Sequence, residues 1–241
     1  MAVKHIQWDH HTVDISYEII NPEAKRDMIV LHGWGSHKEL MRDAFKAELD
    51  TFRHIYIDLP GFGNSTASTK MSTHDYREII ASFLESISAK RDIIIGHSFG
   101  GKVATLLNPD LLVLLSSSGI LESKSLKVLS KIYLFKLLKV FGFAKLRKFF
   151  VASDAKSLEQ HMYETFKQVV NEDFSKHFAH FRKKALICWG TKDQATRLSS
   201  GREVARLMPQ STFLPLEGDH YFFLHHVPTI VSAIETSYIS H

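Results

Sequence analysis

The sequence predicts an α/β fold built on a doubly wound, mostly parallel sheet. Its 241 residues are 44% hydrophobic and 23% charged, which are the proportions of a globular chain. At this length we expect one domain with an insertion. Short aliphatic or β-branched runs alternate with segments of helical periodicity. Because these runs are continuously apolar, they indicate parallel strands that are covered on both faces and joined by right-handed crossovers.

Seven strands are expected in chain order, at Thr12–Ile20, Met28–Leu31, His54–Ile57, Asp92–Ile95, Leu111–Leu115, Ala185–Trp189 and Thr212–Leu216. The first run alternates polar and apolar residues, which favours an antiparallel strand at the edge of the sheet. Helices are expected between the strands, at Lys38–Leu49, Thr73–Ser88, Ser98–Leu107, Gln194–Met208 and Pro228–Tyr238. This alternation predicts helices on both faces of the sheet.

The alternation breaks once, between Ser116 and Ala185, where only helical patterns occur. A structureless loop of that length is uncommon inside a compact domain, so we expect a helical insertion. The predicted units are a core of residues 1–118 and 184–241 and a helical cap of residues 119–183.

Within the predicted cap, the segment Ser123–Ser153 carries eight basic residues and no acidic one, although the net charge of the whole chain is only +4. Apolar residues interleave with these cations at helical spacing, which is typical of a cap helix with its apolar face over the active site. A second hypothesis is electrostatic recruitment of an anionic or carrier-bound substrate. A third is transient contact with an anionic membrane surface.

Composition excludes several other classes. No apolar run approaches the roughly 20 residues of a membrane span, and no signal peptide is evident, so we expect a cytoplasmic protein. The single cysteine, Cys188, excludes an internal disulfide and a multi-thiolate zinc site. His220, His225 and His226 are close in sequence but lack a metal-binding motif, so we expect no metal and no cofactor. No nucleic-acid-binding module is recognisable, and the oligomeric state is open.

The segment Gly96-His97-Ser98-Phe99-Gly100 matches the G-x-S-x-G pattern of a nucleophile elbow. It directly follows the strand-like run Asp92–Ile95 and opens a helical pattern, which is the setting that such an elbow requires. The glycines are needed because the turn is too tight for β-carbons beside the serine backbone. Ser98 is therefore the candidate nucleophile. The alternative is a glycine-rich turn in which Ser98 only caps a helix.

A serine nucleophile needs a base, and the base needs an orienting acid. In folds with this elbow, the chain order is serine, acid, histidine. Asp193 and His220 occur in that order, each directly after a predicted strand, and catalytic groups gather at the carboxyl ends of parallel strands. We therefore expect a triad of Ser98, Asp193 and His220. Asp219 is less suited as the acid, because a sequence neighbour of His220 could hardly reach its Nδ1.

Acyl transfer also needs N–H donors for the oxyanion that develops on the carbonyl oxygen. One is expected from Phe99, which follows the nucleophile, and the other from Trp34, in a glycine-containing loop after the predicted strand Met28–Leu31. The residues beside these groups are the candidate substrate-binding residues, namely His32, Gly33, His97 and Tyr221.

Five segments together resemble the α/β-hydrolase family in their order and spacing. They are His32-Gly33-Trp34-Gly35, Asp58–Ser65, Gly96–Gly101, Trp189–Asp193 and Gly218–His220. The resemblance covers essentially the whole chain. It implies the α/β-hydrolase fold, an eight-stranded, mostly parallel sheet with a helical cap between strands six and seven. It also implies a hydrolase that uses no cofactor.

Within that family, the chain is similar to carboxylesterases, such as the pimeloyl-carrier methyl ester esterases, and to carbon–carbon hydrolases of 2-hydroxy-6-oxo-dienoates. The second group implies Asn before the nucleophile, Trp after the histidine, and a cap arginine. Here these positions hold His97 and Tyr221, with Arg147 or Arg182 as the arginine, which favours ester hydrolysis. The expected substrate is a small to medium carboxylic ester. The alternatives are carbon–carbon hydrolysis and a ligand-binding receptor on the same fold.

Overall fold

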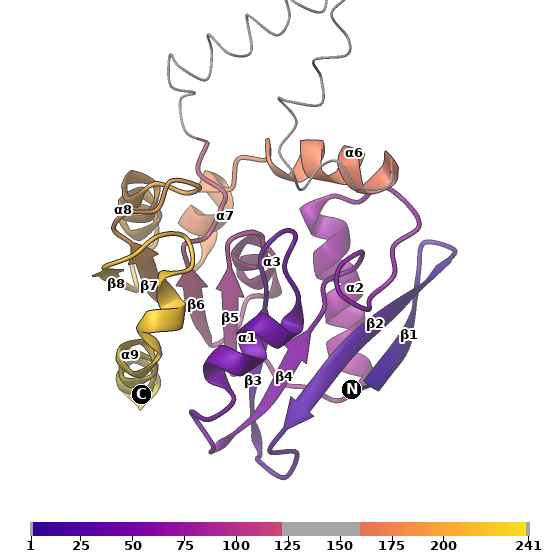
Figure 1. Ribbon diagram of the computed structural model, residues 1–241, viewed down its shortest axis with the longest axis horizontal. Coiled ribbons are helices and arrows are strands. Elements are labelled where there is room, and N and C mark those ends of the chain that lie inside the picture. The colour runs from indigo at the N-terminus through magenta and orange to yellow at the C-terminus, as the bar shows by residue number, and fades with distance from the viewer. Residues whose placement is uncertain (1, 122–159, 240–241) are drawn as a thin grey trace, which may run out of the picture.

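The computed structural model describes residues 2–121 and 160–239 and shows one eight-stranded sheet (Figure 1). Its strands are β1 (Ala2–Trp8), β2 (His11–Ile20), β3 (Arg26–Leu31), β4 (Phe52–Ile57), β5 (Ile93–His97), β6 (Leu111–Leu115), β7 (Lys184–Gly190) and β8 (Ser211–Leu216). The strand order is β1-β2-β4-β3-β5-β6-β7-β8. Strand β2 runs antiparallel to both of its neighbours, and all other pairs are parallel. The predicted sheet, including the eighth strand that the family resemblance implied, is confirmed.

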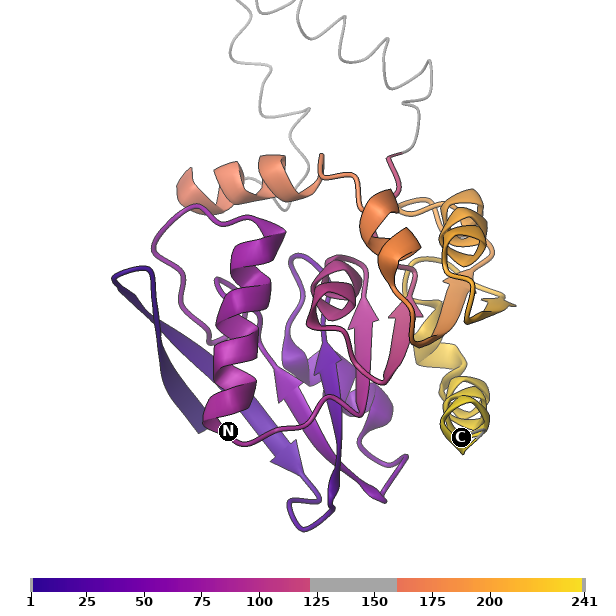
Figure 2. The same ribbon diagram turned by 180° about the vertical axis from the view of Figure 1, so that it is seen from behind.

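Helices cover both faces of this sheet. They are α1 (Lys38–Phe45), α2 (Thr73–Ser86), α3 (Phe99–Leu107), α6 (Gln160–Val169), α7 (Ser175–His180), α8 (Leu198–Leu207), the 3-10 helix η3 (Phe222–His225) and α9 (Val227–Ile239). One face is covered by α1 and α9, and the other by α2, α3 and α8 (Figures 1 and 2).

Alternate side chains of the central strands enter two separate cores. In β3, Met28 and Val30 pack with α1 and α9, whereas Ile29 and Leu31 pack with α2 and α3. Each of these four side chains is fully buried. Burial on both faces explains why the central strands read as continuous apolar runs in the sequence.

The edge of the sheet differs from the prediction. Strand β1, rather than β2, occupies the edge, and of its residues only Ile6 is buried. Asp9 and His10 join β1 to β2 with positive φ angles of 42° and 62°. Positive φ at both central residues is the geometry of a two-residue hairpin turn that matches strand twist. With one buried residue, β1 has too little apolar pattern to be predicted from sequence.

Helix α8 begins at Leu198, four residues later than the helix predicted from Gln194. The reason is that the carboxylate of Asp193 accepts hydrogen bonds from the backbone N–H groups of Ala195 and Thr196. These bonds hold the segment in a turn, which delays the start of the helix.

The predicted insertion lies between β6 and β7, and its described part contains α6 and α7. Helix α6 runs across the top of the molecule, above α2 (Figures 1 and 2). The basic stretch Ser123–Ser153, with Arg147, lies outside the described residues, so the limits of the cap at residues 119–183 stay a prediction. Within residues 2–121 and 160–239, no helix is both long and apolar enough to cross a membrane.

Candidate active site

Ser98 lies in a sharp turn between β5 and α3. Its backbone angles are φ 50° and ψ −113°, a combination that non-glycine residues adopt only under strain. A β-carbon on Gly96 would lie 2.5 Å from the carbonyl oxygen of Gly100, and one on Gly100 would lie 2.5 Å from that of His32. The glycines are therefore required by close backbone contacts. The structure thus places Ser98 in the strand–turn–helix setting expected from the motif, with its side chain partly exposed.

Asp193 and His220, distant in sequence, form a hydrogen-bonded pair. Asp193 follows β7 and His220 follows β8, and Asp193 Oδ2 lies 2.7 Å from His220 Nδ1. The Asp193 side chain is fully buried, whereas that of His220 is 18% exposed. Burial alone would raise the pKa of Asp193, but the hydrogen bonds from His220 and from the Thr196 backbone hold it below its ordinary value. The carboxylate therefore stays charged and accepts a hydrogen bond from the Nδ1–H group of His220.

His97 connects this pair to the elbow. Its Nε2 donates to the backbone carbonyl of His220 at 3.0 Å, and the two imidazole rings lie 4.7 Å apart. Since His97 directly precedes Ser98, this contact holds the loop of His220 beside the elbow. In the part of the chain that the structure describes, His220 Nε2 forms no hydrogen bond, with Ser98 Oγ or any other atom. The pairing of Ser98 with His220 therefore stays a prediction.

Sequence reasoning missed Ser116 and Thr196, which support the carboxylate of Asp193. Thr196 Oγ1 lies 3.0 Å from Asp193 Oδ2 and 3.1 Å from the carbonyl oxygen of Ser116. The Ser116 hydroxyl also lowers the pKa of Asp193 by hydrogen bonding, and it accepts from the Gly190 N–H. No motif marks these residues, because the contacts join the ends of separate strands.

The candidate oxyanion loop is held by His32. Its Nδ1 donates to the Gly33 carbonyl at 2.7 Å, and its Nε2 accepts from the Leu59 N–H at 3.0 Å. Burial lowers the pKa of His32 to about 4, so the ring is neutral and keeps this tautomer at neutral pH. The Gly33 carbonyl and the Trp34 N–H belong to one planar peptide group. His32 therefore also fixes the direction of the Trp34 N–H.

This loop lies against Ser98. A β-carbon on Gly33 would be 3.1 Å from the β-carbon of Ser98 and 2.9 Å from His97 Nδ1. The aromatic rings of Trp34 and Phe99 lie 5.5 Å apart. The two predicted oxyanion donors are thus on segments that contact one another beside Ser98.

The four predicted substrate-binding residues occupy different environments. Tyr221 is 40% exposed, whereas His32 and His97 are at most 1% exposed. Burial, together with the nearby His220, lowers the pKa of His97 to about 3. Gly33 is buried against the elbow. Substrate contact stays a prediction for all four, and the positions of the two buried histidines favour a supporting role.

An aromatic wall stands beside the oxyanion loop. The Trp34 ring lies 4.8 Å from that of Phe62 and 5.3 Å from that of Phe166. Phe166 belongs to α6, so the insertion contributes to the wall. Phe166 was not predicted, because a phenylalanine in an amphipathic helix carries no motif.

Besides contributing Phe62 to this wall, the loop Asp58–Ser65 supports the site from below through Asp58. Asp58 is fully buried and accepts hydrogen bonds from Lys38 Nζ at 2.7 Å, the Lys38 N–H at 2.8 Å and the Asn64 N–H at 3.0 Å. A buried carboxylate with these partners is satisfied. It joins the start of α1, just after the oxyanion loop, to the loop after β4.

Residues 28–233 match the model of the Alpha/beta hydrolase family. The chain belongs to this family. The uncharacterized hydrolase YugF of Bacillus subtilis is 23% identical over 252 residues, covering 91% of this chain and 92% of that protein. A pimeloyl-[acyl-carrier protein] methyl ester esterase of Edwardsiella ictaluri is 35% identical over 82 residues, or 34% of this chain and 30% of that protein.

Among solved structures, the esterase of Exiguobacterium antarcticum matches this alpha/beta hydrolase with a TM-score of 0.75. The match covers 97% of this chain and 98% of that one, at 19% sequence identity. At this identity the similarity shows the fold alone. The reaction and the substrate must be argued from the site.

The remaining predictions concern metals and a cap arginine. Among the residues that the structure of this alpha/beta hydrolase describes, no three His, Cys, Asp or Glu side chains are grouped to hold a metal ion. Arg182 is exposed, and its Nη1 donates to the Ala179 carbonyl at 2.5 Å. The other candidate arginine, Arg147, lies outside the described residues. The carbon–carbon alternative therefore gains no support from Arg182.

Proposed function

We propose that the chain is a serine esterase that hydrolyses small to medium carboxylic esters. The observation that carries this proposal is the 2.7 Å hydrogen bond from His220 Nδ1 to Asp193 Oδ2, formed beside the elbow of Ser98. This bond orients the imidazole and leaves Nε2 as the nitrogen that can accept a proton. The similarity to esterases in the family supports ester hydrolysis over other reactions of this fold.

In the first half-reaction, Ser98 Oγ attacks the ester carbonyl carbon while His220 Nε2 accepts the hydroxyl proton. The charged carboxylate of Asp193 stabilises the imidazolium that forms. The N–H groups of Trp34 and Phe99 bind the oxyanion, and His32 keeps the first of them aimed. The intermediate collapses when the C–O bond breaks and His220 gives its proton to the leaving alcohol.

In the second half-reaction, water replaces the alcohol. His220 Nε2 accepts a proton from the water, whose oxygen attacks the acyl carbon of the Ser98 ester. Collapse of this second tetrahedral intermediate releases the carboxylic acid, and the proton returns to Ser98 Oγ. The overall reaction thus converts one ester and one water into one acid and one alcohol, and it consumes no cofactor.

The proposal is tested by turnover of p-nitrophenyl esters of graded chain length. A methyl ester on a carrier protein and a 2-hydroxy-6-oxo-dienoate are assayed beside them. We expect ester turnover that falls by several orders of magnitude in Ser98→Ala. Turnover of the dienoate far above that of every ester would contradict the proposal and favour carbon–carbon hydrolysis. Binding without turnover of any substrate would favour a receptor.

Ser117→Ala is the matched control for Ser98→Ala. The Ser117 hydroxyl lies behind the elbow, 2.9 Å from the Ser118 carbonyl oxygen and 3.4 Å from that of Ser98. Its removal deletes a neighbouring hydroxyl but no reacting group, so kcat/KM is expected to stay within about tenfold of the wild type. An equal loss in both variants would show that Ser98→Ala acts through the fold.

A further inference from the structure

Helix α3 carries a buried cation whose role the proposed mechanism does not use. Lys102 lies four residues after Ser98, and its side chain is 1% exposed. Its Nζ donates to the Val169 carbonyl at 2.6 Å and lies 3.0 Å from Glu172 Oε2. The ring of Phe174 is 4.4 Å from the same nitrogen. Burying a charge is costly unless it is paired, and all of these partners belong to the insertion between β6 and β7.

Glu172 extends the contact to a third helix. Its carboxylate accepts hydrogen bonds from the N–H and the hydroxyl of Thr73, the first residue of α2. Burial alone would raise the pKa of Glu172, but the Thr73 hydrogen bond and the charge of Lys102 hold it below its ordinary value. The carboxylate is therefore ionised at neutral pH.

The two charges match the dipoles of the helices that they join. Val169 is the last residue of α6, so the Lys102 ammonium lies at the negative end of that helix. The Glu172 carboxylate lies at the positive end of α2, where Thr73 begins the helix. Both placements are favourable. The pair thus fastens α6 to α2 and to the helix that begins after the nucleophile.

Helix α6 in turn contacts the candidate oxyanion loop. Its Phe166 ring lies 5.3 Å from the ring of Trp34, and its Met162 thioether fills the space beside Gly61. Thr165 Oγ1 accepts a hydrogen bond from the Met71 N–H at 3.0 Å. Figure 2 shows α6 lying across the end of α2. The position of α6 therefore sets the position of an uncharged, largely aromatic wall.

We propose that Lys102 and Glu172 are positioning residues that hold α6 against Trp34 and thereby set the size of the apolar acyl group that Ser98 accepts. The inference rests on the proposed esterase function. Neither side chain touches the reacting atoms, so their loss should act on the wall and leave the chemistry intact. Specificity should change more for long acyl groups, which would reach this wall, than for an acetyl group.

The experiment compares wild type, Lys102→Met and Glu172→Gln with two readouts. Hydrogen–deuterium exchange of peptides from α6 measures how firmly the helix is held, and it needs no substrate. We expect exchange in α6 to become about tenfold faster in both variants, because local opening no longer breaks a buried ion pair. Glu172→Gln removes the charge but keeps an acceptor for Thr73, so this variant still tests the proposal if Lys102→Met fails to fold.

The second readout is the ratio of kcat/KM for p-nitrophenyl octanoate to that for p-nitrophenyl acetate. We expect this ratio to change about tenfold, chiefly through KM for the octanoate, with kcat for the acetate within about threefold of the wild type. Equal exchange in the variants and the wild type, or faster exchange with an unchanged ratio, would overturn the inference. A wild type without ester turnover would refute the esterase function, and exchange alone would then decide whether the pair holds α6.

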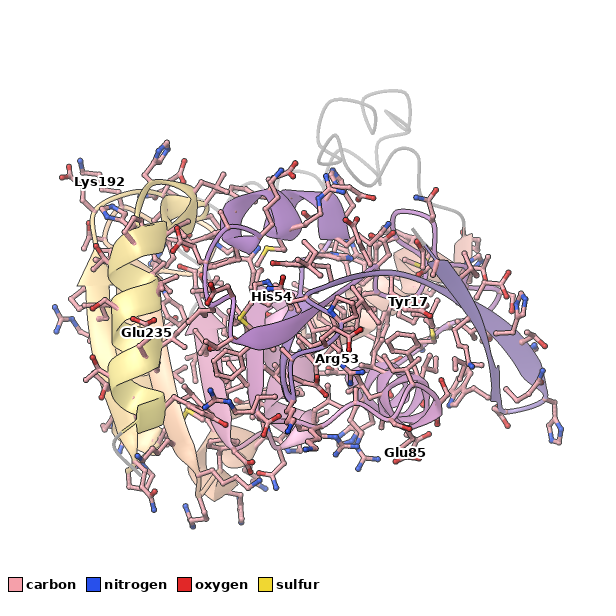
Figure 3. The ribbon with its side chains drawn as sticks, turned by 90° about the horizontal axis from the view of Figure 1, so that it is seen from below. Tyr17, Arg53, His54, Glu85, Lys192 and Glu235 are labelled. Atoms are coloured by element: carbon pink, nitrogen blue, oxygen red, sulfur yellow. The ribbon has the colours of Figure 1, made fainter. Side chains whose placement is uncertain are left out.

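The matched control is the ion pair between Arg53 and Asp27, near the amino-terminal ends of β4 and β3. Its side chains are 20% and 3% exposed, and Arg53 Nε lies 2.7 Å from Asp27 Oδ1. Arg53 lies near the start of β4, next to His54 (Figure 3). Asp27→Asn should lower stability but leave α6 exchange and the ester ratio at wild-type values. The same changes in this control would show that Lys102 and Glu172 act only through global stability.

Discussion

The carboxylate of Asp193 accepts hydrogen bonds at both of its oxygens. Oδ1 binds the N–H groups of Ala195 and Thr196, and Oδ2 binds His220 Nδ1. An amide in its place would present either an NH₂ group or a neutral oxygen to the imidazole. Either would remove the charge that stabilises the imidazolium, and the first would also favour the wrong tautomer.

We therefore expect Asp193→Asn to lower kcat/KM by a factor on the order of 10³–10⁴ while the protein remains folded. Asp219→Asn is the control, because Asp219 is exposed and, among the described residues, its carboxylate accepts a hydrogen bond only from the Tyr221 N–H. It should keep activity within about threefold. Steady-state kinetics on one ester measure both. A larger loss at Asp219 than at Asp193 would show that the acid is misassigned.

We expect His32 to act on catalysis through a single peptide group. If its bond to the Gly33 carbonyl aims the Trp34 N–H, then His32→Leu should lower kcat by about tenfold to hundredfold with KM nearly unchanged. His32→Asn keeps a donor close to the position of Nδ1 and should recover part of the loss. Steady-state kinetics give the kcat and KM values separately. A loss confined to KM would contradict a role in orienting the oxyanion donor.

His54 is the matched control for His32. It is also fully buried, and its ring nitrogens lie 3.0 Å from the Tyr56 hydroxyl and 2.9 Å from the Leu49 carbonyl oxygen. It lies on β4, level with the start of β5, whereas the elbow follows the end of β5. His54→Leu should cost similar stability yet leave kcat at the wild-type value. Equal losses of kcat in both variants would show that buried histidines act here only through stability.

Strands β3 to β8 and the elbow could be predicted from the sequence, because their signals, continuous apolar runs and the glycines around Ser98, each lie within a few residues. Strand β1 could not be predicted in this way, since only one of its residues, Ile6, is buried. The start of α8 was also misplaced, because the side chain of Asp193 bonds the following backbone. The contacts of His32 with Leu59 and of Lys102 with Glu172 span 27 and 70 residues, and no short-range pattern encodes them.

The contact of Lys102 illustrates why. Lys102 interrupts a helix in which Phe99, Val103 and Ala104 are all buried, and a cation among such neighbours signals a buried partner. The identity of that partner depends on how α6 crosses α2 and α3. The ion pair between Lys102 and Glu172 was therefore not predicted from the sequence.

Close packing of α3 against β3 gives a prediction about stability. A methyl group on Gly100 would lie 2.5 Å from the backbone oxygen of His32, which cannot move without shifting β3. Gly100→Ala should therefore lower the free energy of unfolding by about 1–3 kcal/mol, measured by urea denaturation. Gly35→Ala is the comparison, because its methyl group meets open space and its cost, about 1 kcal/mol, comes from a φ of 73°. A stability unchanged in Gly100→Ala would refute the contact.

For the whole molecule, buried neutral histidines determine how stability depends on pH. Burial lowers the pKa of His32 to about 4 and that of His97 to about 3, and it lowers the pKa of His54 as well. In the unfolded chain these groups titrate near about 6.5. Below that pH the unfolded state binds more protons than the folded state, so the free energy of unfolding must fall as pH falls.

Each such histidine contributes a slope of about 1.4 kcal/mol per pH unit once the pH is well below 6.5 and above its folded pKa. Urea midpoints between pH 7.5 and pH 4.5 should therefore decline increasingly steeply below about pH 6.5. His54→Gln removes one of these groups and should reduce the slope without removing the decline. A stability that is constant from pH 7.5 to pH 4.5 would contradict the neutral, buried state of these rings.

The central claim is that Ser98 is a nucleophile activated by His220 and Asp193. The most direct test is reaction with a fluorophosphonate, followed by mass spectrometry of the proteolytic peptides and by the rate of labelling in Ser98→Ala and His220→Ala. We predict one adduct, on Ser98, that is absent in Ser98→Ala and forms at least about a thousandfold more slowly in His220→Ala. An adduct on another residue, or equal labelling rates in wild type and His220→Ala, would contradict the account.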